Sequence, residues 1–334
     1  MAHKVTMQDI ANELGITKVS VSKALNDQPG VSGMLRKQVR ETAESMGYVL
    51  NRTMTDGQKM HFAFVVPKRF FLETDNFYNI IYYYLNKICM NAGHQLTCIV
   101  LNTKEEENNI FPEAIMLDDV NGFFLGGEIA DGYLDMLSKT NLPLVAIDFY
   151  KTFLDVDYIL TDNYYLGYYA AEYLIKRGHK EIGFVGNISQ TTSIYDRYFG
   201  YLKAMHYYGL PVADNWVISN NDIRTGVYTL GVELPEKLPT AFVCHCDMAA
   251  YFLMNSLNKL GKEIPEDVSL ISFDNTELSR TMAPQLTSFD IDRKEIAKIS
   301  FQTMVKLLRG EKRKNRHYIS AALVERDSVN PIEN

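Results

Sequence analysis

Apolar residues recur at helical spacing in three short segments near the start of the chain. In Met7–Leu14 they group on one face, and Gly15 then supplies a residue that readily adopts the left-handed conformation of a sharp turn. Thr17 is a good N-cap for a second helix, Lys18–Leu25. A third helix is predicted to begin after Ser32. Two helices joined by a tight turn and braced by a third are typical of a helix-turn-helix domain, although a three-helix domain of another function would show the same periodicity.

From residue 61 onward, short apolar runs alternate with longer amphipathic segments. The predicted strands are Phe62–Val66, Leu96–Leu101, Gly122–Leu125, Leu144–Ile147, Ile182–Val185, Ala241–Cys244 and Val268–Phe273, and the predicted helices are 76–92, 133–139, 165–177, 196–208 and 248–260. This alternation is typical of doubly wound parallel sheets, and two such series indicate two lobes facing each other across a cleft. The predicted fold class is therefore α/β, with an all-α helix-turn-helix head followed by two doubly wound parallel-sheet lobes. Ligands on such sheets bind beyond the carboxyl ends of the strands.

Composition limits the remaining possibilities. The chain has 334 residues, enough for a small head and a two-lobed body. It has no apolar run of about 18 residues and no signal-peptide hydrophobic core near its start, so we expect a cytoplasmic protein with no membrane partner. Its four cysteines do not indicate a disulfide framework in so long a chain.

The identities of the residues in the first 51 positions decide between a helix-turn-helix domain and a three-helix domain of another function. The informative positions are Thr6, Asp9, Ala11, Gly15, Thr17, Val21, Ser22, Leu25, Asn26, Val31, Ser32, Arg36, Val39, Ala43, Gly47, Tyr48 and Asn51. This pattern resembles the head of the LacI/GalR family of bacterial transcription regulators. The resemblance implies a LacI-type helix-turn-helix DNA-binding domain at residues 1–50 and a hinge or linker at 51–60.

The body resembles the same family's effector domain, which is periplasmic-binding-protein-like. The segments that match are GFFLGG, PLVAID, LTDNYYLGYYAAEYLIKRGHKEIGFVG, GKEIPEDVSLISFDNTE, PQLTSF and LVERDSV, so the resemblance extends to about Ser328. It implies an effector-binding and dimerisation domain at 61–334. The implied lobes are about 61–160 with 291–318, and about 161–290 with 319–330. The basic run Arg309–His317 is then expected to be a solvated connection.

Charge is unevenly distributed along the chain. Residues 1–59 carry a net charge of +2, whereas the whole chain carries −7, which leaves −9 for the body. A weakly basic head attracts phosphates only modestly, so we expect operator affinity to require two heads in a homodimer. Most of the 21 tyrosines and 17 phenylalanines are expected in the core and at the subunit interface.

The expected partner of the head is double-stranded operator DNA. The residues that the resemblance assigns to DNA contact are Thr6, Thr17, Lys18, Val19, Ser20, Ser22, Lys23, Asn26, Asn51, Arg52 and Met54. Lys18, Val19 and Lys23 point outward from the second helix, where lysine can donate to guanine and valine can pack on a thymine methyl group. A homodimer would place two such helices about one DNA turn apart on a near-palindromic site.

Polar side chains at the ends of predicted strands indicate an effector site. Asp148 and Asp274 each follow a strand, where they face the cleft and can accept hydroxyl hydrogen bonds from a sugar or cap the next helix or turn. Arg197 matches the family's effector-binding arginine and is predicted to open a helix. Its guanidinium can hold two hydroxyls or one anion, or can form an ion pair that stabilises a lobe. Ser193 and Phe77 are the further candidates near this cleft.

One departure from the family pattern lies in this cleft. His245 and Cys246 replace the usual Asn-Asp pair, so an imidazole stands where an asparagine usually holds a ligand hydroxyl, and His245 becomes an effector-binding candidate. The fragment from Cys244 to Asp247 also resembles part of a metal site. On a strand, however, the two thiols would share a face with His245 pointing away, and no second Cys/His pair completes four ligands. We therefore predict no metal and no cofactor.

A second departure lies in the hinge. Family members usually follow Asn51 with a short helix that wedges a leucine into the minor groove. Here the stretch is about three residues short and Gly57 occupies the leucine position. Met54 is the alternative wedge, although helix propensity around Asp56 and Gly57 is poor. A plain flexible linker is the other interpretation.

These features predict a sequence-specific DNA-binding transcriptional regulator, a repressor of a carbohydrate-utilisation operon controlled by a small effector such as a sugar or sugar phosphate. The alternative is an effector-independent DNA-binding regulator with a decayed ligand pocket, which the His245–Cys246 pair and the altered hinge favour. An enzyme is not expected, because the chain contains no phosphate-cradling glycine loop, HExxH or Gly-x-Ser-x-Gly sequence.

Overall fold

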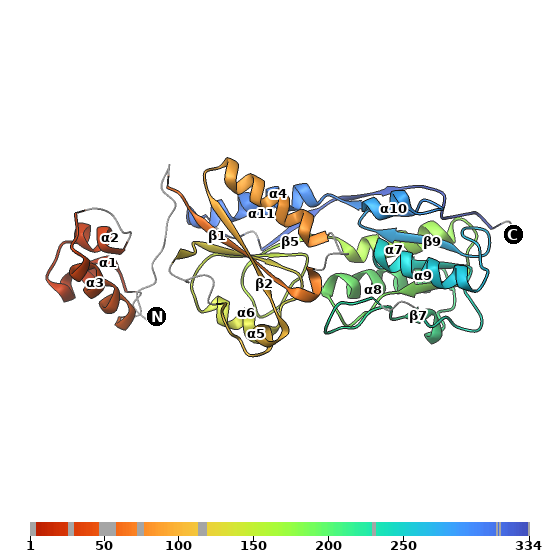
Figure 1. The fold of residues 1–334 in the computed structure, drawn as a ribbon, viewed down its shortest axis with the longest axis horizontal. Coiled ribbons are helices and arrows are strands. Elements are labelled where there is room, and N and C mark those ends of the chain that lie inside the picture. Colours follow the sequence, from red (N-terminus) through yellow and green to blue (C-terminus); the bar gives the residue numbers. More distant parts are fainter. Residues whose placement is uncertain are drawn as a thin grey trace.

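The computed structural model describes residues 5–25, 30–46, 58–71, 77–112, 119–228, 232–311, 313 and 315–332. Figure 1 shows a small helical head and two larger parts, each built around a sheet. The residues predicted to contact DNA at Asn26, Asn51, Arg52 and Met54, and most of the hinge at 51–60, lie outside the described residues.

The head contains α1 (Met7–Leu14), α2 (Lys18–Leu25) and α3 (Gly33–Ser45). Thr6 and Asp9 form a reciprocal capping box at the start of α1, and Gly15 ends this helix with a φ of 63°. The Thr17 hydroxyl accepts a hydrogen bond from the Ser20 amide at 3.1 Å, which caps α2. The core of the head consists of Ile10, Ala11, Val21, Ala24, Leu25, Val39 and Ala43. The predicted helix-turn-helix head is therefore confirmed.

The first sheet is entirely parallel, with the strand order β11-β5-β4-β3-β1-β2. Its strands are β1 (His61–Pro67), β2 (Gln95–Leu101), β3 (Gly122–Gly126), β4 (Leu144–Ile147), β5 (Asp157–Thr161) and β11 (Arg316–Ile319). Its helices are α4 (Phe77–Asn91), α5 (Thr103–Glu107), α6 (Asp131–Ser138) and α11 (Arg293–Leu308), with the short helix η1 (Lys68–Phe70) after β1. Alternation along β1 separates the two faces, because Phe62 and Phe64 join the core under α4 and α11 whereas Ala63 and Val65 join the core under α6. We call this part lobe one.

The second sheet has the order β12-β10-β9-β8-β6-β7 and is parallel except for β12, which pairs antiparallel with β10. Its strands are β6 (Ile182–Val185), β7 (Val217–Ile218), β8 (Ala241–Cys244), β9 (Ser269–Phe273), β10 (Thr287–Ile291) and β12 (Ala321–Val324). Its helices are α7 (Asn163–Ile175), α8 (Thr192–Tyr207), α9 (Asp247–Lys259) and α10 (Glu277–Thr281), with the short helix η3 (Asp214–Trp216) before β7. Residues of α7 and α8 share one core with the sheet, and residues of α9 share the core on the opposite face. We call this part lobe two.

The chain crosses between the lobes three times, after β5, after β10 and between β11 and β12. Each lobe has helices on both faces of its sheet, as the separate cores on the two faces show. The predicted α/β fold class with two doubly wound, mainly parallel lobes is therefore confirmed. In the described part of the chain, no helix is long and apolar enough to cross a membrane.

One local prediction was wrong and another holds in part. The helix predicted at 196–208 begins at Thr192, because the Thr191 hydroxyl accepts the Ile194 amide hydrogen at 3.1 Å and caps the helix one turn earlier. Arg197 therefore lies in the second turn of α8 and does not open it. The expectation that the basic run 309–317 is solvated holds for its described residues except His317, which is half-buried in β11 with its ring 3.1 Å from the Asp157 carboxylate.

Candidate functional site

A cavity between the two lobes collects side chains from the carboxyl ends of strands in both sheets. We call it the central cavity, and its free volume is about 60 Å³. Its walls comprise Arg69, Phe70, Phe77, Tyr78, Asp148, Gln190, Thr191, Ser193, Ile194, Arg197, Asn221, Gly226, Tyr228, His245, Cys246 and Asp274. All six residues proposed from the sequence as effector-binding candidates line this cavity. Their geometry decides what they can bind.

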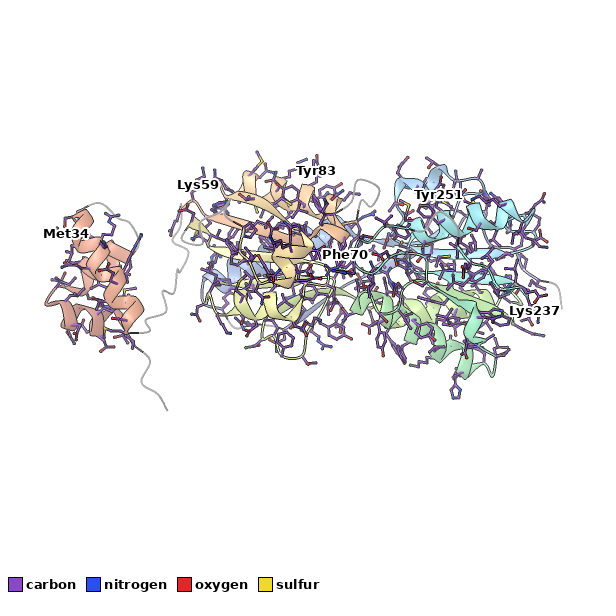
Figure 2. The ribbon with its side chains drawn as sticks, turned by 60° about the horizontal axis from the view of Figure 1, so that its bottom comes forward. Met34, Lys59, Phe70, Tyr83, Lys237 and Tyr251 are labelled. Atoms are coloured by element: carbon purple, nitrogen blue, oxygen red, sulfur yellow. The ribbon has the colours of Figure 1, made fainter. Side chains whose placement is uncertain are left out.

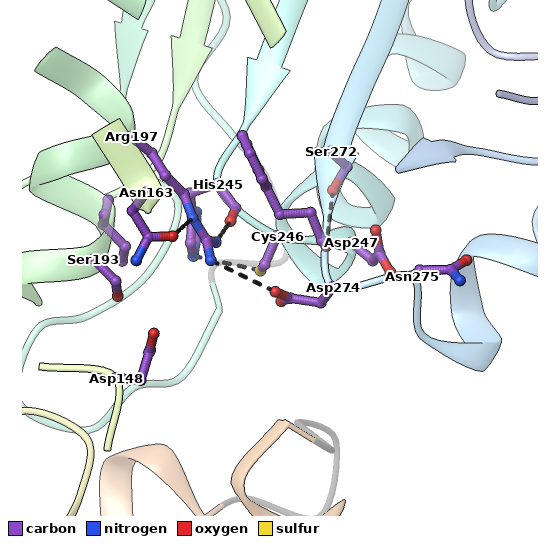
Figure 3. A network of polar contacts seen from close by, with 12 residues as sticks. Asp148, Asn163, Ser193, Arg197, His245, Cys246, Asp247, Ser272, Asp274 and Asn275 are labelled. Carbon is purple, nitrogen blue, oxygen red and sulfur yellow. Dashed lines mark hydrogen bonds and ion pairs between the residues drawn. The ribbon is translucent and has the colours of Figure 1, made fainter. Parts of the chain in front are cut away.

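Arg197 is the most extensively bonded of these side chains and is only 4% exposed. Its Nε donates to Oδ1 of Asn163 at 2.8 Å, and one terminal nitrogen donates to the backbone carbonyl of His245. The other terminal nitrogen lies 3.8 Å from Oδ1 of Asp274 (Figure 3). The guanidinium also stacks over the Phe273 ring, 4.5 Å from its centroid. All of these partners belong to lobe two, so the arginine organises one wall of the cavity.

The carboxylates of Asp148 and Asp274 come from opposite lobes, at the ends of β4 and β9, and both residues have a positive φ. Oδ1 of each is buried and forms no hydrogen bond with a described residue, whereas Oδ2 of Asp148 accepts the Tyr78 hydroxyl at 3.1 Å. Burial raises the pKa of Asp148 to about 6, against the lowering effect of the Arg197 guanidinium. Burial likewise raises the pKa of Asp274. Buried polar atoms normally have partners, so these two oxygens are suited to accept hydroxyl hydrogens from a ligand.

His245 contacts Cys246 and Tyr228 in the wall of the cavity. Its Nδ1 lies 3.3 Å from the Val185 carbonyl, which can only accept, so the proton is assigned to Nδ1 and Nε2 is left as an acceptor. Nε2 lies 3.4 Å from Sγ of Cys246, and the Tyr228 hydroxyl lies 3.1 Å from the same sulfur. Burial, together with the charge of Arg197, lowers the pKa of His245 to about 3, so its imidazole is neutral at physiological pH.

The prediction that His245 points away from the thiols was wrong for Cys246. Strand β8 ends at Cys244, and Cys246 is the N-cap of α9, where its sulfur accepts the Ala249 amide hydrogen. The period-two alternation of a strand therefore does not extend to Cys246. Cys244 is fully buried in the core under α9. Among the described residues, no group of three or more His, Cys, Asp or Glu side chains could hold a metal ion.

The remaining candidates occupy the edges of the cavity. Ser193 lies in the first turn of α8, where its hydroxyl is 3.0 Å from that of Thr191. Phe77 is the first residue of α4 and packs edge-to-face on Tyr78. Sequence reasoning missed Tyr78, although it is adjacent to Phe77, and it missed Asn163, which directly follows the crossover from β5. Both make their contacts through tertiary structure, which no local pattern indicates.

The candidate DNA-contacting residues of the head divide into two groups. Lys18 and Val19 lie exposed on α2, with Val19 63% exposed despite its apolar side chain, and Ser20, Ser22 and Lys23 are half-buried on the same helix. An exposed valine beside lysines on one helix suits a groove lined by thymine methyl groups and base acceptors.

Thr6 and Thr17 cap helices, and this structural role does not depend on contact with DNA. Each accepts a backbone amide hydrogen at a helix N-terminus, from Asp9 and from Ser20, respectively. Helix N-termini attract phosphate groups, so a capping residue at this position remains compatible with a contact to the DNA backbone.

A helix-turn-helix head on a two-lobed body with polar groups between the lobes defines the class of ligand-responsive DNA-binding regulators. Residues 6–51 match the model of bacterial regulatory proteins of the lacI family, and residues 171–329 match a periplasmic binding protein-like domain. The chain is 30% identical, over 292 residues and 85% of each chain, to the HTH-type transcriptional repressor PurR of Actinobacillus pleuropneumoniae serotype 3 (strain JL03). The chain therefore belongs to the LacI family of bacterial regulatory proteins.

Solved structures show the same fold. The complex of the transcriptional regulator CelR with cellobiose has a TM-score of 0.67 at 21% identity and covers 97% of this chain and 100% of the other. The lac repressor dimer bound to operator and to the anti-inducer ONPF has a TM-score of 0.68 at 18% identity and covers 98% of this chain and 100% of the other. At these identities the likeness concerns the fold alone.

Proposed function

We propose that the protein represses a carbohydrate-utilisation operon and that a small sugar-like effector in the central cavity controls its affinity for operator DNA. The observation that carries this proposal is a pair of carboxylate oxygens, one from Asp148 and one from Asp274, that form no hydrogen bond with a described residue and lie beside the Arg197 guanidinium. Two acceptors and a forked donor suit a ring of hydroxyl groups. The division into a head at 1–50, a linker at 51–60 and a body at 61–334 is part of this proposal.

The size of the central cavity indicates how an effector would act. About 60 Å³ holds roughly two water molecules and lies far below the range of about 300–1,000 Å³ typical of ligand pockets. Contacts between the lobes hold this arrangement, since Glu128 accepts from the Thr192 amide and hydroxyl, and the Tyr150 hydroxyl donates to Asp196. A sugar must separate the lobes to enter, so its binding changes the lobe arrangement that the two heads sense. Reciprocal linkage then requires operator DNA to change effector affinity by the same factor.

The proposal includes a homodimer that reads a near-palindromic operator through α2. Tyr83 and Met90 of α4 are 60% and 65% exposed, and Tyr251 of α9 is 37% exposed. Figure 2 shows Tyr83 on lobe one and Tyr251 on lobe two. Exposed aromatic and apolar side chains on both lobes are of the kind that a subunit interface covers. The lac repressor forms a dimer on its operator in the solved structure, which supports this assembly.

Operator binding titrated against a panel of sugars and sugar phosphates tests the proposal. Arg197→Ala removes the forked donor, but it also strips Asn163 and His245 of their partner, so a loss of response in that variant alone is not informative. Asp274→Asn is the sharper variant, because asparagine tolerates a positive φ and Oδ1 of Asp274 forms no hydrogen bond with a described residue, so among its contacts only the 3.8 Å ion pair with Arg197 is weakened. We expect Asp274→Asn to retain operator binding and thermal stability but to lose the sugar response.

A second candidate function is an effector-independent repressor with a decayed pocket. Two observations favour it: the Arg197 side chain already donates to Asn163 and His245, and Tyr228 packs against His245 and Cys246 where a ligand would lie. If no sugar or sugar phosphate changes the operator affinity of the wild-type protein, this function replaces the first.

A further inference from the structure

A second and larger cavity lies where the chain crosses from β5 to α7. We call it the crossover cavity, and its free volume is about 220 Å³, equivalent to roughly seven water molecules. It shares Asp148 and Ser193 with the central cavity, but its other walls are different. Tyr150 and Arg316 contribute from lobe one and Asp196 from lobe two. The volume is suitable for a molecule the size of a single sugar ring.

Two buried polar atoms on the walls of this cavity have no hydrogen-bond partner. Oγ1 of Thr161 belongs to a side chain that is 4% exposed, and Oδ1 of Asp148 belongs to one that is 7% exposed. A buried hydroxyl or carboxylate oxygen without a partner is costly, and native proteins retain few of them. Thr161 lines the crossover cavity and not the central cavity, so a ligand in the crossover cavity would supply the partner that its hydroxyl lacks. Asp148 lines both cavities, so a ligand in either one can reach its Oδ1.

The charges around the cavity indicate the type of ligand. The carboxylates on its walls belong to Asp148, Asp162 and Asp196, and the cation among the described wall residues is Arg316. The Arg316 guanidinium lies over the Tyr150 ring, 5.1 Å from its centroid. Asp162 caps α7 and Asp196 accepts the Tyr150 hydroxyl at 3.1 Å. Burial raises the pKa of Asp196, and the charge of Asp162 contributes to this rise. The wall therefore has an excess of acceptors and of negative charge.

We propose that the crossover cavity is a second ligand site, separate from the central cavity, and that it binds a small protonated amine such as an amino sugar. An ammonium group carries three donors and a positive charge, which matches several carboxylates better than a neutral hydroxyl does. The bound amine contacts Tyr150 of lobe one and Asp196 of lobe two. It therefore stabilises the lobe arrangement at the crossover and changes operator affinity without entering the central cavity.

Calorimetry on the full chain with glucosamine and glucose tests this inference, because the two probes differ by an ammonium group in place of one hydroxyl. Asp196→Asn keeps an acceptor for Tyr150, and Asp162→Asn keeps a good N-cap, so both variants remove charge with little effect on the fold. We expect each variant to weaken glucosamine binding about tenfold and to leave glucose binding unchanged. Arg316→Gln removes the opposing charge and is expected to strengthen glucosamine binding.

Three results overturn the inference. The first is the absence of glucosamine binding to the wild-type protein. The second is unchanged glucosamine binding in both aspartate variants. The third is loss of glucosamine binding in Asp274→Asn but not in Asp196→Asn, which places the amine in the central cavity. This third result leaves the proposed sugar response intact. Conversely, the absence of any response to neutral sugars, with amine binding that depends on Asp196, refutes the proposed function alone.

Discussion

Replacement of Asp148 by asparagine is expected to stabilise the protein at neutral pH. Asp148 is 7% exposed, its Oδ1 forms no hydrogen bond with a described residue, and its backbone has a φ of 64° that asparagine tolerates. Burial raises its pKa to about 6, whereas an unfolded aspartate has a pKa of about 3.9. The amide oxygen of asparagine still accepts the Tyr78 hydroxyl, so the substitution removes the charge and keeps the hydrogen bond.

The direction and size of the effect follow from this pKa difference. Because the folded state binds the proton more tightly, the stabilisation is fully present below the unfolded pKa and is lost as pH rises through about 6. A rise of about two units corresponds to about 3 kcal/mol at pH 8, and asparagine avoids this loss. For a body of this size we expect Asp148→Asn to raise Tm by about 5 to 10 °C at pH 8 and by little at pH 4.

Thermal unfolding of the full chain from pH 4 to pH 8 measures this difference, and Asp247 provides a matched control. The pKa of Asp247 is also raised to about 6 by burial, but its two oxygens accept hydrogen bonds from the Thr276 amide and hydroxyl and from the Ser288 hydroxyl. The amide nitrogen of asparagine cannot accept a hydrogen bond, so Asp247→Asn loses about 1 to 3 kcal/mol at every pH. This loss offsets the gain from removing the charge at pH 8 and appears alone as a lower Tm at pH 4. The reasoning is refuted if Asp148→Asn lowers Tm equally at pH 4 and pH 8, or if the two variants behave alike.

Three further variants probe other parts of the structure. In Gly167→Ala, the added Cβ would overlap the carbonyl oxygen of Arg197, so α7 and α8 must move apart; we expect a loss above about 3 kcal/mol in thermal unfolding, and a neutral result would show that the two helices slide freely. Lys18→Ala should weaken operator binding by about 1–3 kcal/mol and relax preference at one base pair, measured on single-base operator variants; an equal loss on every sequence would mean a phosphate contact. Thr17→Ala removes the cap that the Ser20 amide uses, so the head should lose about 1 kcal/mol, and retention of full amide-exchange protection in α2 would contradict this.

The sequence predicted those features of the fold that depend on local patterns. Apolar runs located strands such as β1, and alternation along it explains why Phe62 and Ala63 face different helices. The strand-end positions of Asp148 and Asp274 also follow from pattern, because the carboxyl ends of parallel strands meet at one edge of a sheet. Prediction from apolar periodicity failed where a side chain capped a helix. Thr191 caps α8, which therefore starts earlier than predicted, and Cys246 caps α9, so the alternation of the preceding strand does not extend to it.

The contacts within the site depend on tertiary structure and could not be predicted. Arg197 meets Asn163 and the His245 carbonyl, which lie far from it in the chain, and Tyr78 reaches Asp148 from another element. The spacing of apolar residues along the chain gives no information about contacts between residues that are far apart in sequence. The unpartnered hydroxyl of Thr161 carries no sequence signal either, since an ordinary buried strand threonine looks the same.

The outer strand of lobe one has a consequence for synthesis of the chain. Strand β11 pairs with β5, but its residues are made only after every strand of lobe two except β12. A nascent chain on the ribosome therefore exposes the edge of β5 while most of the second sheet forms, and unpaired edges are sites of aggregation. The head is stabilised by contacts between residues close together in sequence, so it can fold before the two lobes are complete. During translation the DNA-reading unit thus exists before the lobes that are proposed to control it.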